Sequence, residues 1–166
     1  MDMIQNNSVI NLKKGKIGMW DKYRHESKQT ICIIGVLILA TKLCKADGHF
    51  SITEEEAILK IIPHDPKDKR ILYRIMDEAG EDDKPIDYDA LRLKKLIGDD
   101  HGDFLEFIIA VLYQLAHIDH VYSEEEDRDI KKVAEIFGLE ETFLQSIKRK
   151  TLLFFKNLKR KNDNEN

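Results

Sequence analysis

The sequence has few cysteines, and the two present cannot form a disulfide with each other. Cys32 and Cys44 lie twelve positions apart in one predicted helix of this 166-residue chain. Twelve helical residues span about 18 Å, whereas a disulfide needs α carbons within about 7 Å. The first thirty residues also lack an apolar stretch typical of a secretory signal. We therefore expect a cytoplasmic protein with reduced thiols.

The sequence also lacks an apolar run of the length that crosses a bilayer. Its longest run is centred on Thr30 to Ala40 and extends over about fifteen residues before Lys42 and Lys45, whereas a span needs about 20. A membrane helix is the alternative interpretation, but the length favours a buried central helix.

Catalytic signatures are missing as well. The sequence contains no Gly-x-Ser-x-Gly elbow, no glycine-rich phosphate loop and no His-Glu-x-x-His zinc helix. Cys44 lies on an apolar helix, where a cysteine is normally a core residue. We expect a protein that is not an enzyme.

Charge is segregated along the chain, and this excludes nucleic acid as the main partner. Residues 1–50 carry a net charge of +4, residues 51–140 carry −12, and residues 141–166 carry +4. An acidic body repels phosphate, while basic ends are able to contact an anionic membrane surface or fold back on the body. No protein partner and no oligomeric state follow from the sequence.

What the sequence does contain is a repeated hinge. Asp47 to Glu54 has a counterpart 72 residues later in Asp119 to Glu126. In each copy a serine, Ser51 or Ser123, stands where a helix begins and is followed three residues later by glutamate. This Ser-x-x-Glu pattern is typical of a capping box, in which side chains satisfy the first backbone N–H groups of a helix. The repeat predicts a duplicated helix-loop-helix unit.

Apolar periodicity predicts about seven helices, and no stretch alternates with the period of a strand. The fold class that follows is an all-α, single-domain bundle, with the two most apolar helices packed at its centre. Glycines or a proline end several helices. The predicted helix starts are about Glu26, Ser51 or Thr53, Asp65 with Pro66, Asp87, Asp103, Ser123 and about Glu140.

Three segments divide the chain. Residues 1–25 are predicted to be a flexible arm whose end is anchored by Trp20 and Tyr23, residues 26–147 the helical domain, and residues 148–166 a basic helix extension and tail.

These residues resemble the TerB-like domain, the all-helical module of tellurite-resistance TerB proteins that is similar also to the N-terminal domain of DjlA-type membrane co-chaperones. The resemblance covers about residues 28–147. It rests on Lys45-Ala46-Asp47-Gly48 with Ser51 and Glu54, on Ile118-Asp119 with Ser123 and Glu126, and on the tail from Val133 to Leu139.

The resemblance implies a non-catalytic binding or scaffolding module linked to stress response, with cation binding at acidic positions. His120 departs from the glycine expected in the second turn. The membrane segment and the His-Pro-Asp tripeptide of a DjlA-type co-chaperone are both missing, so chaperone stimulation is not carried over.

Two sharper hypotheses follow. The first is a divalent cation site where the hinges meet, taking calcium or magnesium if oxygen ligands dominate and zinc if imidazoles do. An EF-hand is excluded, because the sixth position from Asp47 is Ile52 and the twelfth is Ile58. The alternative is that these acidic side chains only brace turns and caps. The candidate ligands are Asp47, His49, Glu54, Asp119, His120 and Glu126.

The second hypothesis is contact with an anionic membrane or a partner through the basic C-terminal helix, where bulky apolar residues alternate with lysines. The alternative is that the apolar residues pack on the body while the lysines stay solvated. The candidate residues are Lys148, Arg149, Lys150, Phe154, Phe155, Lys156, Lys159 and Arg160.

Overall fold

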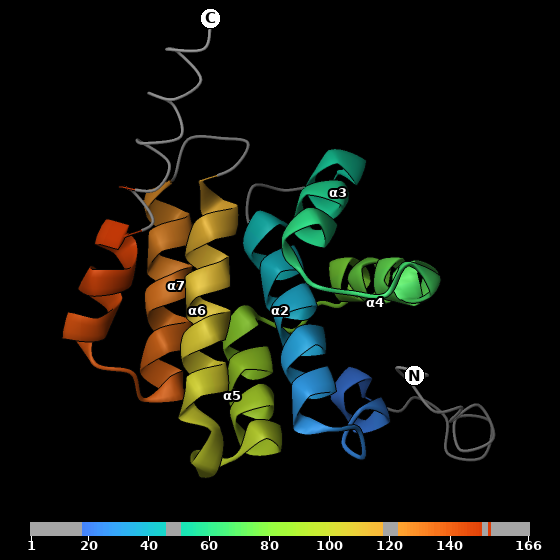
Figure 1. Cartoon of the computed structure of the whole chain (residues 1–166), viewed down its shortest axis with the longest axis horizontal. Helices are drawn as coiled ribbons and strands as arrows, with labels where there is room; N and C mark the ends of the chain where they lie inside the picture. The colour runs from blue at the N-terminus through green and yellow to red at the C-terminus, as the bar shows by residue number, and fades with distance from the viewer. Residues whose placement is uncertain (1–17, 46–50, 118–122, 151–152, 154–166) are drawn as a thin grey trace, which may run out of the picture.

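The computed structural model describes residues 18–45, 51–117, 123–150 and 153, and in these ranges the chain is all-helical with no strand. This confirms the predicted fold class. Of the predicted flexible arm, residues 1–17 lie outside these ranges and residues 18–25 lie inside them. The α-helices are α2 (Lys28–Lys45), α3 (Ile52–Ile61), α4 (Lys69–Glu81), α5 (Ile86–Ile97), α6 (Gly102–Ala116), α7 (Glu124–Phe137) and a last helix over residues 141–150 (Figure 1).

The centre of the bundle is α2, which packs against α4, α5 and α6. Fourteen of its eighteen residues are buried, so this helix is apolar all round because it is surrounded by protein. No helix in the described ranges combines the length and the apolar character needed to cross a membrane. The prediction of a buried central helix is confirmed, as is the packing of α2 on α6.

Local signals set most helix ends as predicted. Ser51 and Ser123 are the N-caps of α3 and α7, and their side chains accept from the backbone N–H of Glu54 and Glu126. At the other ends, Gly98 and Gly138 follow α5 and α7 with φ of 83° and 76°, a left-handed conformation that glycine adopts at little cost.

Two predicted caps are wrong. Helix α5 begins at Ile86 after Pro85, so Asp87 lies in its first turn rather than at its cap. Helix α6 begins at Gly102, which likewise moves Asp103 into the first turn. In both cases the aspartate lies near the positive end of the helix, where a carboxylate is favourable without acting as a cap.

The end of the predicted arm joins the core. Trp20 and Tyr23 are buried, in and just after a 3₁₀ turn at Met19–Lys22. Ion pairs from this turn reach α4 through Lys22 and Glu78, and α5 through Asp21 and Arg92. The predicted anchoring by Trp20 and Tyr23 is therefore confirmed.

Candidate functional site

The first hinge ends in a complete capping box. The backbone N–H of Ser51 donates to Oε2 of Glu54 at 2.8 Å, and the backbone N–H of Glu54 donates to the Ser51 hydroxyl at 3.2 Å. These reciprocal bonds satisfy backbone donors that have no partner within the helix. Glu54, a candidate cation ligand, therefore already serves the start of α3.

The second hinge uses the same residue types in a different arrangement. The backbone N–H of Glu126 donates to the Ser123 hydroxyl at 3.1 Å, and this hydroxyl donates to Oε1 of Glu126 at 3.0 Å. Glu126 is 1% exposed, whereas Glu54 is half-buried. A buried carboxylate thus lies in the first turn of α7, seven residues after Asp119 in the sequence.

The described residues that flank the two hinges lie at the same end of the bundle. Helices α2 and α6 pack together, and Figure 1 shows them running in the same direction, so that their last turns lie at one end. The first turns of α3 and α7 return from that end. The duplicated unit therefore brings the residues that flank the two hinges to one side of the molecule.

The complete cation site stays a prediction. Asp47, His49, Asp119 and His120 lie outside the described residues. Within the described ranges, no group of three or more histidine, cysteine, aspartate or glutamate side chains is arranged to hold a metal ion. The two described candidates, Glu54 and Glu126, both take part in helix caps.

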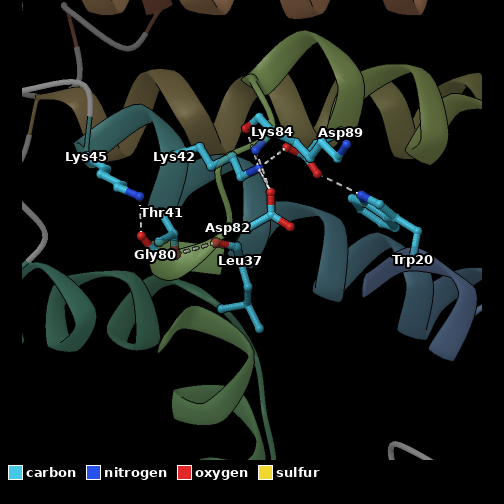
Figure 2. A network of polar contacts seen from close by, with 9 residues as sticks. All are labelled: Trp20, Leu37, Thr41, Lys42, Lys45, Gly80, Asp82, Lys84 and Asp89. Atoms are coloured by element: carbon cyan, nitrogen blue, oxygen red, sulfur yellow. Dashed lines mark hydrogen bonds and ion pairs between the residues drawn. The ribbon is translucent and has the colours of Figure 1, made fainter. Parts of the chain in front are cut away.

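A buried ionic network lies near the first hinge, and the sequence interpretation did not find it (Figure 2). The Lys42 ammonium lies 2.6 Å from Oδ2 of Asp89 and 3.0 Å from Oδ1 of Asp82, and it donates to the Lys84 carbonyl at 2.6 Å. On the far side, the indole N–H of Trp20 donates to Oδ1 of Asp89 at 2.8 Å. We call these five residues the Lys42 network.

Burial and pairing compete in setting the acidity of these carboxyl groups. Burial raises the pKa of Asp89, against the opposing effect of hydrogen bonds from Lys42 and Trp20. Burial acts in the same direction on Asp82, but hydrogen bonds from the Lys84 backbone and from Lys42 outweigh it, and the net effect lowers the pKa of Asp82. The lysine therefore joins one deeply buried carboxyl and one carboxyl closer to solvent.

The geometry gives Lys42 a structural rather than a chemical role. An ammonium has three N–H donors, and three oxygen atoms lie within reach of this one. All three donors therefore serve to join α2 to Asp82, Lys84 and Asp89. In the last turn of α2, Lys45 donates to the Gly80 carbonyl in the last turn of α4. Two lysines therefore attach this helix end to the end of α4 and to the segment that follows it.

One signal in the sequence could have revealed the network. The buried stripe of α5 contains Ile86, Ala90, Leu93 and Ile97, and Asp89 lies among them. A carboxylate in an apolar stripe requires a buried partner, and Lys42 follows directly after the most apolar run of the chain. Lys42 and Asp89 are 47 positions apart, so no local sequence pattern indicates that they pair.

Three basic residues of the C-terminal segment are described; one forms an ion pair with the body of the protein and two are exposed. Lys148 forms an ion pair with Asp127 of α7 at 2.7 Å, while Arg149 and Lys150 are exposed. The remaining candidates, Phe154, Phe155, Lys156, Lys159 and Arg160, lie outside the described residues.

The buried thiol of Cys32 is poorly suited to nucleophilic chemistry. Burial, together with the nearby Asp103 carboxylate, raises the pKa of Cys32 to about 12. At neutral pH such a cysteine is a thiol and not the reactive thiolate.

Comparison with protein families identifies the chain. Residues 34–149 match the family model described as "Tellurite resistance protein TerB". Comparisons with curated proteins and with solved structures gave no match. The matched region extends from the middle of α2 almost to the end of the last described helix, and it includes both hinges and every residue of the Lys42 network except Trp20. Because the match covers more than half of the sequence, the chain belongs to the TerB family.

Proposed function

We propose that this chain is a non-catalytic TerB-family interaction module, acting in stress response, whose hinge end binds a divalent cation and then a protein partner. The observation that carries the proposal is that α2 and α6 pack in the same direction, so both serine-capped hinges start from one end of the bundle. Carboxylates and imidazoles that are 72 positions apart in the sequence are thereby directed to a common region.

The surroundings of the hinges support a preformed site. The Lys42 network and the Lys45 contact fix the last turn of α2, and the Ser51 box fixes the first turn of α3. A hinge held at both ends loses less conformational entropy when it binds a ligand. Two buried cysteines without a disulfide are consistent with the cytoplasm as the place of action.

The experiment is thermal unfolding of the chelator-stripped full chain, followed by circular dichroism, with calcium, magnesium, manganese or zinc added back separately. A cation that binds only the folded state at about a hundred times its Kd adds about 2.7 kcal/mol of stability. Asp47→Ala and Asp119→Ala should each abolish this gain.

The matched control is Asp100→Ala, which removes an exposed carboxylate in the turn before α6, at the opposite end of that helix. It should leave the cation effect intact. If no cation stabilises the stripped protein, or if all three variants respond alike, the hinge carboxylates serve turns and caps only.

A second candidate function is a peripheral membrane adaptor that acts through the basic C-terminal helix. The observation in its favour is that Arg149 and Lys150 are exposed close to Leu153, whose exposed fraction is 56%. Basic residues beside an exposed leucine are typical of helices that lie on anionic bilayers.

The test compares sedimentation with vesicles of phosphatidylcholine alone and with vesicles that contain phosphatidylserine. Deletion of residues 151–166 together with Arg149→Glu and Lys150→Glu leaves the Lys148–Asp127 pair in place and should abolish binding to the anionic vesicles. Absence of binding by the intact chain would rule this function out.

A further inference from the structure

An apolar groove of about 380 Å³ lies between α2, α6 and the segment after α3, at the opposite end of α2 from the hinges. The described chain leaves it open, although cavities of this size and apolar character are typical of binding sites. Phe107, which is 43% exposed, forms part of its wall. The lining residues are Gln29, Cys32, Ile33, Val36, Ile62, Pro63, Asp103, Phe104 and Phe107.

The groove carries one charged group. Asp103 is the one acidic residue among those that line the groove, and it is exposed in the first turn of α6. Asp99 and Asp100 precede it in an exposed turn. An occupant that complements this arrangement has apolar side chains followed closely by basic ones.

The chain itself contains such a segment. Residues 9–14 read Val-Ile-Asn-Leu-Lys-Lys, so that three apolar side chains directly precede two lysines. These residues lie outside the described ranges and rejoin them at Gly18. The order of apolar and basic residues matches the apolar groove and the carboxylate at its edge.

The chain between Leu12 and Gly18, when extended, can reach halfway around a helix such as α2. The turn after Gly18 is attached to α5 by the hydrogen bond from Trp20 to Asp89 and by the ion pair between Asp21 and Arg92. Helix α5 contacts α2 at Gly35, which lies on a different side of α2 from the residues that line the groove. Half the circumference of a helix about 11 Å wide is about 17 Å. The six residues from Leu12 to Gly18 span up to about 20 Å when extended.

We propose that this groove binds the chain's own N-terminal segment, with Ile10 and Leu12 between α2 and α6 and Lys13 or Lys14 against Asp103. The arrangement buries apolar side chains on both partners and pairs the charge at the groove edge. It requires neither the cation at the hinges nor the basic C-terminal helix.

The test is methyl NMR of the full chain carrying a nitroxide at Ser8→Cys. Cys32 and Cys44 are buried, which directs the label to the new thiol. The Ile33 and Val36 methyl signals should lose most of their intensity, whereas Val133 in α7 should not. The loss should disappear when Ile10→Asp and Leu12→Asp are added, and should persist with the control pair Gln5→Asp and Asn7→Asp.

Charge reversal gives an independent arm of the same experiment. Asp103→Lys should weaken the broadening, and Lys13→Glu with Lys14→Glu should restore it. Unchanged Ile33 and Val36 signals in the labelled chain would overturn the proposal. So would broadening that appears only when labelled and isotope-enriched chains are mixed, because the occupant would then be a second copy.

Discussion

At the scale of single residues, Lys42 is the group on which most polar contacts converge. Its ammonium joins α2 to α5 through Asp89 and to the preceding segment through Asp82 and Lys84. With side-chain exposures of 6% for Lys42 and 1% for Asp89, water replaces neither partner if the other is removed. Removing one partner of such a pair strongly destabilises the fold, because the other charge stays buried without compensation.

The first prediction concerns the removal of one partner of this buried ion pair. Lys42→Met leaves the Asp89 carboxylate buried without its cation, and we expect a loss of about 3–5 kcal/mol in the free energy of unfolding. Urea titration followed by circular dichroism measures it. Adding Asp89→Asn, whose amide oxygen still accepts from Trp20, should recover much of the loss, and a double variant no more stable than the single one would contradict this explanation.

A second residue-scale prediction concerns pH. Burial, together with the charge and hydrogen bond of Asp77, raises the pKa of Glu55 to about 7. The folded protein therefore holds this proton more tightly than the unfolded chain, whose glutamate titrates near 4.5. The resulting stability is complete below pH 4.5 and is lost as the pH rises through about 7.

The measurement is the melting temperature between pH 5 and 8. Glu55→Gln should remove the part of the pH dependence that Glu55 contributes, whereas Glu56→Gln, an exposed neighbour on α3, should leave it. Equal pH profiles for the native chain and the Glu55 variant would rule out a contribution of the raised Glu55 pKa to stability.

At the scale of helices, α2 and α5 approach each other closely at Gly35. A methyl group at Gly35 would lie 2.5 Å and 2.6 Å from the two terminal carbons of Leu93, closer than real carbon atoms approach. The glycine is thus present in this apolar helix because α5 leaves no room for a side chain.

Gly35→Ala should therefore destabilise the protein by about 1–3 kcal/mol through overpacking, and Leu93→Val should partly compensate. Urea titration again gives the values. Gly102→Ala is the control, because the first turn of α6 has open space around this glycine and helical dihedral angles, so alanine should be neutral or slightly stabilising. Equal losses at both glycines would contradict the steric explanation.

Helix ends also show what the sequence could and could not predict. The serine caps and the glycines that end α5 and α7 were predicted correctly because their signals lie within three or four residues, whereas Gly80, expected to end α4, lies within its last turn. Asp87 and Asp103 were misplaced because an aspartate is favourable both at a cap and in the first turn. The Lys42 network was missed because its partners meet only through the packing of α2 on α5.

At the scale of the whole molecule, stability is unevenly distributed. Fourteen of the eighteen residues of α2 are buried, but only Ile58 and Leu59 of the ten residues of α3. Local opening is easiest where few apolar contacts have to be broken.

Amide hydrogen exchange should therefore be faster in α3 than in α2. Mass spectrometry after timed exchange resolves the two segments. If a cation occupies the hinges, its addition should slow exchange in the first turns of α3 and α7 more than in α5. Protection of α3 equal to that of α2 would show that the contacts of α3 are stronger than its burial indicates.

The single tryptophan of the chain is an optical reporter of this architecture. Trp20 is 2% exposed, and its indole N–H is bonded to the same carboxylate that Lys42 binds. Its fluorescence should therefore be blue-shifted in the folded protein and respond when the Lys42 network is broken, even if the helices remain. Emission and circular dichroism recorded together on one unlabelled sample distinguish release of the segment at Met19–Lys22 from unfolding of the bundle.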